Sequence, residues 1–416
     1  MVPEKTVAFV PVYSVLHDAK AVEETLSRYL DRVNSLPFFS FRQKEREELR
    51  PEEEAIFFVV TGGSEELVLE TLPGRPDPVL LLAHPDMNSL PAALEIMARL
   101  TQLGRHGQVI YLTDDETASL KQLDIALRVI STYRRMHGAR LGLIGRPSDW
   151  LVASSPQPEL VTRVWGPEVV TIAMDEVLRR LEAAEPAAVK DLTEEFLAQA
   201  SGVLEPAPQD LERAAAVYLA LRQVVDTYHL DALSIRCFDL VLQAKTTGCL
   251  ALSRLIDEGV IAGCEGDLPA ALTMMLLSYL SDETPFMANP ARVNPEDKTI
   301  WLAHCTVARR LLTSYVVRSH FESGIGVGIQ GELKPGPVTL ARIGGATLEH
   351  FYAADGELRE TGRAVNLCRT QVRIELPHGV DYFLKRPLGN HHVMVYGHWK
   401  EAFFTYGNLA GLMPVV

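Results

Sequence analysis

Short apolar runs alternate with longer amphipathic segments through much of the sequence, and this order restricts the possible folds more than any other feature. A short apolar run bounded by turn residues is typical of a buried strand, and an apolar residue at every third or fourth position is typical of a helix. In the first part of the chain the two patterns alternate at residues 6–13, 19–36, 55–60, 78–84, 90–104 and 107–112. Such alternation predicts a parallel sheet with helices on both faces. We assign this N-terminal α/β domain to residues 1–139.

The same order resumes at residue 140 and predicts a second doubly wound α/β domain at 140–283. Its first segment, "ARLGLIGRPSDW" at 139–150, predicts a strand followed by a glycine turn, which we interpret as an ordinary strand-to-helix connection. Residues 210–230 form an amphipathic pattern that predicts a long helix. Further strands are expected at 231–240, 260–267 and 285–290, with a helix at 268–282 between the last two.

Beyond residue 284 the segments become shorter and are separated by glycine or charged turns, which predicts a β-rich, antiparallel, barrel-like C-terminal domain at 284–416. The glycines of "SGIGVGIQGEL" at 323–333 superficially resemble a dinucleotide-binding fingerprint. They alternate with Ile325, Val327 and Ile329 at the period of a strand, so we favour a bending strand. The predicted fold class is therefore α/β, with two doubly wound parallel-sheet domains followed by the β-rich domain.

Composition and charge exclude several classes of protein. The 416 residues are 47% hydrophobic and 23% charged, as expected for a globular protein of several domains. A net charge of −14 repels phosphate backbones and argues against a nucleic-acid partner. No apolar run is long enough for a membrane span and the first residues lack a signal-peptide pattern, so we expect no membrane association and a cytoplasmic location. Five cysteines without CxxC spacing predict reduced thiols.

Two acidic residues follow a predicted strand and precede a predicted helix in "GCEGDLPAALTMM". Open α/β sheets bind their ligands at the carboxyl ends of their strands, so Glu265 and Asp267 are candidate catalytic residues. Residues two apart in an extended segment point the same way, so we expect both carboxylates to face one site. For Asp267, a simple helix cap is an equally good interpretation.

Further candidate ligands lie on later strands. Asn289 ends the predicted strand in "FMANP", and His304 lies in "WLAHCT", where an imidazole is more often part of the core than a ligand. Three histidines then fall within the otherwise apolar run "GNHHVMVYGH" at 389–398. A carboxylate, an amide oxygen and imidazoles together suit a divalent ion such as Mn²⁺.

These motifs carry a family resemblance. "CEGD", "FMANP" and the C-terminal segment "GNHHVMVYGHWKEAFFTYGNLAGLMPVV" resemble the L-fucose isomerase family and its L-arabinose isomerase relatives. The resemblance is strong at 260–295 and at 389–416, and extends to the first 250 residues only as architecture. It implies two α/β domains before a β-rich domain, and a Mn²⁺ site that interconverts aldoses and ketoses.

The resemblance also implies particular residues. The family binds Mn²⁺ through a glutamate, an aspartate and a histidine, which fall here on Glu265, Asn289 and His391. Asparagine in place of the aspartate is a departure, because its carbonyl oxygen can bind a metal but cannot carry a proton. Glu265 then acts as the base alone, or Asp267 substitutes for the missing acid, or the reaction differs.

The expected activity is a metal-dependent sugar ketol-isomerisation through an enediolate, in which the metal stabilises negative charge and a carboxylate moves the proton. The alternatives are a non-catalytic carbohydrate-binding relative, or a related metal-dependent sugar reaction, because of Asn289. Candidate sugar-binding residues are His304, His392, His398 and Trp399. The resemblance further implies a homo-oligomer, a trimer or hexamer, with sites at subunit interfaces.

Overall fold

The computed structural model describes residues 5–415. Within it, the chain forms two compact units, the first of which comprises residues 1–134 with 408–410, and the second the remainder. The two units are described separately below.

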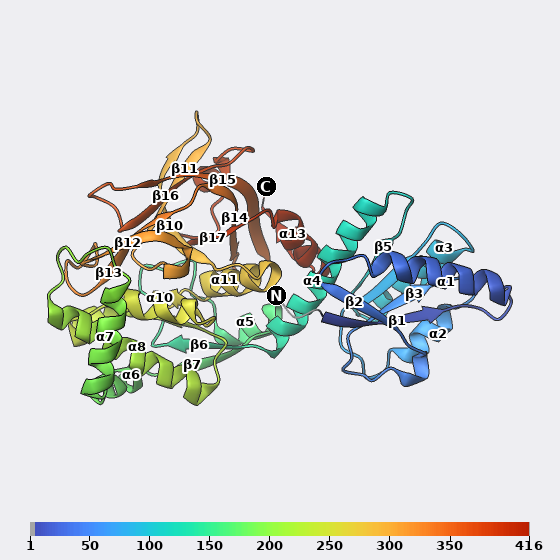
Figure 1. Ribbon diagram of the computed structural model, residues 1–416, viewed down its shortest axis with the longest axis horizontal. Helices are drawn as coiled ribbons and strands as arrows, with labels where there is room; N and C mark the ends of the chain where they lie inside the picture. Colours follow the sequence, from blue (N-terminus) through green and yellow to red (C-terminus); the bar gives the residue numbers. More distant parts are fainter. Residues whose placement is uncertain (1–4, 416) are drawn as a thin grey trace. The chain divides into compact units, whose positions relative to one another are not determined.

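The first unit contains a five-stranded parallel sheet in the order β2-β1-β3-β4-β5 (Figure 1). Its strands are β1 (Lys5–Val12), β2 (Phe39–Gln43), β3 (Ala55–Val59), β4 (Val79–Ala83) and β5 (Gly107–Tyr111). Its helices are α1 (Ala19–Val33), α2 (Glu65–Thr71), α3 (Ser89–Gln102) and α4 (Glu116–Gly138), the last of which runs into the second unit, and a short 3₁₀ helix lies at Arg46–Glu48.

Side chains of β1 alternate between two hydrophobic cores, one on each face of this sheet. Val7 and Phe9 pack with residues of α1 and α4, whereas Ala8 and Val10 pack with residues of α2 and α3. The helices therefore cover both faces, as the sequence predicts. The sequence prediction missed the short elements β2 and α2 and also the long helix α4; β2 has the sequence "FSFRQ" and alternates apolar with polar residues.

The second unit begins with a four-stranded parallel sheet in the order β7-β6-β8-β9. Its strands are β6 (Arg140–Ile144), β7 (Glu168–Ile172), β8 (Ala232–Ile235) and β9 (Ile261–Cys264). The helices of this part are α5 (Pro158–Trp165), α6 (Met174–Glu182), α7 (Pro186–Ala198), α8 (Pro208–Tyr228), α9 (Cys237–Ala244), α10 (Cys249–Asp257) and α11 (Leu268–Ser281).

An antiparallel barrel follows, in which the order β14-β17-β10-β11-β16-β15 closes through pairing of β14 with β15. Its strands are β10 (Phe286–Asn294), β11 (Thr299–His304), β14 (Gly336–Gly344), β15 (His350–Gly362), β16 (Thr370–Glu375) and β17 (His392–Tyr396). Outside this ring lie the hairpin β12 (Leu312–Arg318) and β13 (Gly328–Leu333), the short strand β18 (Met413–Pro414), the helices α12 (Asp381–Lys385) and α13 (Lys400–Leu409), and a 3₁₀ helix at Arg309–Leu311. The predicted fold class is confirmed, and the division into three domains stays a prediction.

Two details of the sequence prediction need correction. The segment 285–290 was expected to extend the second parallel sheet, but β10 pairs antiparallel with β11 and β17 inside the barrel. In the glycine-rich segment only 328–333 is a strand, because Gly324 and Gly326 adopt φ values of 69° and 60° in the preceding turn. A Cβ on Gly326 would lie 2.8 Å from the Thr247 side chain, so the turn lies close against that residue.

Helix α11 joins the second sheet to the barrel. It is apolar on all sides and packs against β8 and β9 as well as against β14 and β17 (Figure 1). A helix with this pattern is stable only when it is enclosed on every side. The N-terminus of α11 therefore lies in the interior, where the sheet meets the barrel.

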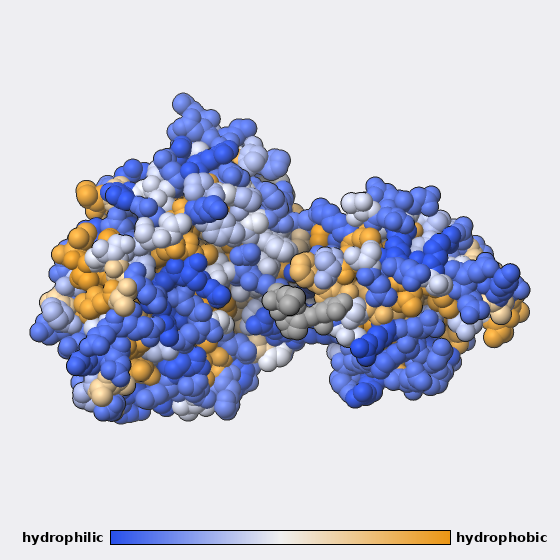
Figure 2. All heavy atoms as spheres, in the orientation of Figure 1, coloured by the Kyte–Doolittle hydropathy of each residue, from blue (hydrophilic) through white to orange (hydrophobic). Residues whose placement is uncertain are grey.

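In the view of Figure 2, hydrophilic residues predominate and hydrophobic residues form small groups between them. Among residues 5–415, no helix combines the length and the hydrophobicity needed to cross a membrane.

Candidate metal centre

The site is built around the turn between β9 and α11. Glu265 adopts φ 64° and Gly266 φ 69°, so this turn is left-handed. The sequence interpretation, which assumed an extended segment here, was wrong on this point. A left-handed conformation is uncommon for a residue with a side chain and is retained only where surrounding contacts enforce it. Here the N–H of Ser148 donates to the Glu265 carbonyl oxygen at 2.8 Å.

Glu265 and Asp267 nevertheless face the same imidazole, that of His391, immediately before β17. Nδ1 of His391 lies 3.0 Å from Oδ2 of Asp267, and Nε2 lies 3.5 Å from Oε1 of Glu265. The imidazole is fully buried, and Nε2 has no hydrogen-bond partner. A buried nitrogen that makes no hydrogen bond is costly unless a nearby charge or a ligand compensates it.

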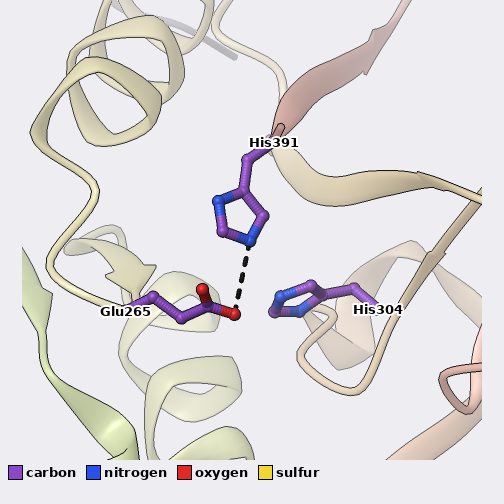
Figure 3. A group of neighbouring side chains, drawn as sticks. All are labelled: Glu265, His304 and His391. Carbon is purple, nitrogen blue, oxygen red and sulfur yellow. Dashed lines mark ion pairs between the residues drawn. The ribbon is translucent and has the colours of Figure 1, made fainter. Parts of the chain in front are cut away.

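His304, the last residue of β11, completes a buried group of three. One ligand atom from each of Glu265, His304 and His391 lies within 4.8 Å of the others. Figure 3 shows the carboxylate and both rings directed toward a common point, with a dashed line between His391 and Glu265. Nδ1 of His304 accepts a hydrogen bond from the Thr306 N–H at 3.1 Å, which leaves Nε2 as the nitrogen available to a ligand.

Charge is balanced locally within this interior. Asp267 forms an ion pair with Arg342 of β14 at 3.1 Å, and both side chains are fully buried. Asp267 also accepts from the Ala270 N–H and so caps α11, which confirms the helix-cap interpretation of this residue. Ser154 accepts a hydrogen bond from the same guanidinium at 2.7 Å. These contacts make Asp267 an orienting partner of His391, and its predicted role as a proton carrier stays untested.

The pKa values of the buried groups follow from these contacts. Burial lowers the pKa of His391, but the hydrogen bond with Asp267 and the negative charges of Asp267 and Glu265 outweigh burial and raise the pKa to about 9. Burial raises the pKa of Asp267, but Arg342 and His391 outweigh burial and lower it to about 2. Burial and the neighbouring His391 lower the pKa of His304 to about 3. In the absence of a cation, His391 is therefore protonated and His304 neutral near pH 7.

Asn289 lies on β10, which is between β11, whose last residue is His304, and β17, which begins directly after His391. It pairs with Ala303, next to His304, while the preceding residue Ala288 pairs with His392. The side-chain oxygen of Asn289 is buried and has no hydrogen-bond partner. An unpartnered buried oxygen at this place is consistent with its predicted role as a ligand, which stays a prediction.

The other predicted sugar-binding residues have partners of their own. His392 is buried among aromatic rings, and its Nε2 lies 3.1 Å from the Tyr382 hydroxyl. The His398 side chain is 66% exposed and lies 3.8 Å from Asp355. Trp399 donates its indole N–H to the Tyr396 carbonyl oxygen. None of these three belongs to the group formed by Glu265, His304 and His391 within residues 5–415, and their sugar-binding role is untested.

The sequence interpretation missed two residues of the site, Trp150 and Arg342. The indole Nε1–H of Trp150 donates to Oε2 of Glu265 at 2.6 Å. Trp150 follows the carboxyl end of β6, which lies between β7 and β8, so the strand order reverses at β6, and ligand sites of open α/β sheets lie at such positions. This rule could have identified the 145–150 loop as part of the site, whereas the sequence analysis interprets it as an ordinary strand-to-helix connection.

The fold and the site together define an α/β protein with a C-terminal barrel and a buried Glu-His-His group able to hold a divalent cation. Carboxylate and imidazole ligands suit such ions as manganese and zinc.

Comparison with known proteins adds distant relatives, although no family model matches the sequence. The sulfoquinovose isomerase of Alkalicoccus urumqiensis is 25% identical over 319 residues, which cover 73% of this chain and 70% of that protein. That of Clostridium sp. (strain MSTE9) is 24% identical, over 63% of this chain and 58% of that protein. That of Priestia aryabhattai is 21% identical, over 56% of this chain and 54% of that protein.

This chain is therefore distantly related to sugar isomerases. The predicted relationship to aldose–ketose isomerases is confirmed as a distant one. The more particular resemblance to L-fucose isomerases stays a prediction.

Proposed function

We propose that the protein is a metal-dependent sugar isomerase that interconverts an aldose and a ketose. The observation that carries this proposal is the buried group of Glu265, His304 and His391, in which Nε2 of His391 makes no hydrogen bond and lies 3.5 Å from Oε1 of Glu265. The distant relationship to sulfoquinovose isomerases supports the same class of reaction.

In this proposal Glu265 and His391 hold the cation, which is Mn²⁺ or another divalent ion. Asp267 accepts the Nδ1–H of His391 and so keeps Nε2 directed at the cation, as carboxylates commonly do behind histidine ligands. Nε2 of His304 is left for the cation or for a substrate oxygen, and Asn289 supplies a further neutral oxygen. When bound, the cation supplies stabilisation of the negative charge that develops on O1 and O2 of the sugar.

The charges of the chain fit that chemistry. Without a cation, the carboxylates of Glu265 and Asp267 are balanced by protonated His391 and by Arg342. Replacing the His391 proton with a divalent ion leaves the interior with one excess positive charge. An excess positive charge stabilises an enediolate more than the neutral sugar, which is the differential binding that lowers a barrier.

Glu265 is the proposed base of the reaction. It takes the proton from one carbon and returns it to the neighbouring carbon, and its pKa is lowered by His391 and Trp150 in spite of burial. A buried carboxylate that stays ionised can accept a proton. The relatives' names make sulfoquinovose a substrate to include in any panel of sugars. Assembly as a trimer or hexamer stays a prediction.

Solvent exchange tests this proposal directly. With Mn²⁺ in D₂O, the protein is expected to introduce deuterium at C1 or C2 of its sugar, followed by NMR over a panel of aldoses and ketoses. A chelator should stop the exchange. Absence of exchange with every sugar, in protein shown to hold Mn²⁺ and to bind a sugar, would instead favour the non-catalytic carbohydrate-binding relative.

Metal uptake is expected to release a proton from His391. The folded pKa of about 9 lies above the ordinary value of 6.5, so in the metal-free protein this contribution to stability is complete below pH 6.5 and disappears as the pH rises through 9. A cation must displace the proton, so Mn²⁺ binding near pH 7 should release about one proton, and affinity should rise about tenfold per pH unit up to about pH 9.

Isothermal titration in buffers of different ionisation enthalpy counts these protons. The His391→Gln variant should release none, while the exposed His398→Gln variant serves as the control and should behave as the wild type. Equal heats in all buffers for the wild type would show that His391 is not a ligand.

A further inference from the structure

The two carboxylate oxygens of Glu265 face different partners. Oε2 accepts the indole N–H of Trp150 at 2.6 Å, whereas Oε1 lies 3.5 Å from Nε2 of His391. Trp150 is 49% exposed, and it comes from a different strand end than either histidine. The indole therefore holds one oxygen of the carboxylate while the other faces the proposed cation.

The same loop also fixes the backbone of the turn that carries Glu265. The Ser148 N–H donates to the Glu265 carbonyl oxygen at 2.8 Å. A Cβ on Gly266 would lie 2.7 Å from the Arg146 carbonyl oxygen, so the loop leaves no space there for a side chain. The loop from β6 thus contacts Glu265 through both its main chain and its side chain.

Arg236, at the end of β8, anchors this loop in turn. Its guanidinium donates to the Pro147 carbonyl oxygen at 2.6 Å and to Oδ2 of Asp149 at 2.8 Å. The indole of Trp150 also makes an edge contact with Phe238, with ring centroids 4.8 Å apart. A hydrogen-bond donor that is itself held by its neighbours can fix the orientation of a carboxylate.

We infer that Trp150 is a positioning residue, which fixes the Glu265 carboxylate so that Oε1 alone is presented to the cation. This inference rests on the proposed function. An indole N–H is a neutral donor that does not titrate, so it orients the carboxylate without cancelling the charge that the cation needs. A lysine or arginine at this place would orient Glu265 equally well but would compete electrostatically with the cation.

The Trp150→Phe variant tests the inference, since it removes the N–H and keeps an aromatic ring beside Phe238. Loss of a hydrogen bond to a charged group should weaken Mn²⁺ binding and lower kcat, each on the order of tenfold, with KM changed less than about threefold. Mn²⁺ affinity is measured from the EPR signal of the free ion. Trp301→Phe, the same replacement on β11, is the control and should match the wild type in affinity, kcat and KM.

A crystal structure of the Trp150→Phe protein gives a readout that needs neither metal nor sugar. The carboxylate of Glu265 is expected to turn away from His391 once its Oε2 partner is lost. Unchanged Mn²⁺ affinity with a change in KM alone would overturn the inference, because the indole would then serve the sugar directly. An unmoved carboxylate would overturn it as well.

Failure of the proposed function would give a different result from failure of the inference about Trp150. In that case the wild type itself would neither bind Mn²⁺ nor exchange protons of any sugar. The position of the Glu265 carboxylate in the Trp150→Phe crystal would still decide whether Trp150 fixes it.

Discussion

The Glu265→Gln variant is expected to lose sugar turnover by a factor on the order of 10²–10⁴, because a neutral amide can no longer take up the proton that moves between the carbons. Glutamine keeps the size of the side chain, and its oxygen can still accept the Trp150 N–H. The negative charge that attracts the cation is lost, so Mn²⁺ affinity should fall together with kcat. Turnover and Mn²⁺ binding are measured on the same preparation.

Folding should survive this replacement, because the buried pair of Asp267 and Arg342 and the cap of α11 do not involve Glu265. Circular dichroism and thermal unfolding check that expectation. Glu360→Gln, which removes a carboxylate that is 52% exposed and pairs with Arg373 on the barrel, is the matched control and should keep full activity. If Glu265→Gln retained full turnover, Glu265 would have no part in proton transfer.

The second large effect concerns stability. Asp267→Ala is expected to lower the free energy of unfolding of the metal-free protein by about 3–5 kcal/mol, because it leaves the fully buried guanidinium of Arg342 without its carboxylate. The same replacement removes the cap of α11, which typically contributes about 1 kcal/mol. This loss is not simply added to the loss from the buried ion pair, because one carboxylate makes both contacts. Urea unfolding with fluorescence detection measures the total.

Asp381→Ala provides a control on the surface. Asp381 pairs with Lys385, and both side chains are more than two-thirds exposed, so the expected loss is below about 1 kcal/mol. The pH dependence adds a second check. The lowered pKa of Asp267 means that its contribution is complete above its ordinary value of 3.8 and disappears as the pH falls through about 2. A loss for Asp267→Ala as small as that of the control would show that Arg342 reaches water.

Glu265 and His391 could be identified from the sequence because each lies in a short distinctive motif, "CEGD" and "NHH". The family resemblance predicted that the two residues are neighbours, and in the structure Nε2 of His391 lies 3.5 Å from Oε1 of Glu265. The backbone conformation that places Glu265 there differs from the predicted one. Glu265 adopts a left-handed conformation that the extended-segment argument did not foresee, because this turn is held by hydrogen bonds with distant parts of the chain, from Ser148 to the Glu265 carbonyl oxygen and from Gly266 to the Ile235 carbonyl oxygen.

Arg342 and Trp150 could not be found in the same way. Arg342 lies in "PVTLARIGG", where it has the pattern of an ordinary strand residue, and its contact with Asp267 spans 75 residues. The contact between Trp150 and Glu265 spans 115 residues. Local patterns predict which residues form a strand, but they do not predict which distant side chain will meet a buried carboxylate.

The C-terminal domain was predicted as antiparallel and barrel-like, but the order of its strands and the pairing of β14 with β15 that closes the barrel were not predicted. "PFMANP" has the apolar character of either kind of sheet, so its assignment to the parallel sheet was wrong. This segment belongs to the barrel because it pairs with β11 and β17, which lie later in the chain. Strand pairing at such separations depends on tertiary packing that a local pattern does not encode.

In the proposed function, closure of the barrel also determines when the ion site forms. Asp267 and His391 are 124 residues apart, and they meet only once β17 is seated between β10 and β14. An unfolded or partly folded chain therefore offers no site of the native geometry, and the free energy of ion binding acts on the completed fold. On this proposal, discrimination among metals depends on the folded site and not on the order in which ions meet the nascent chain.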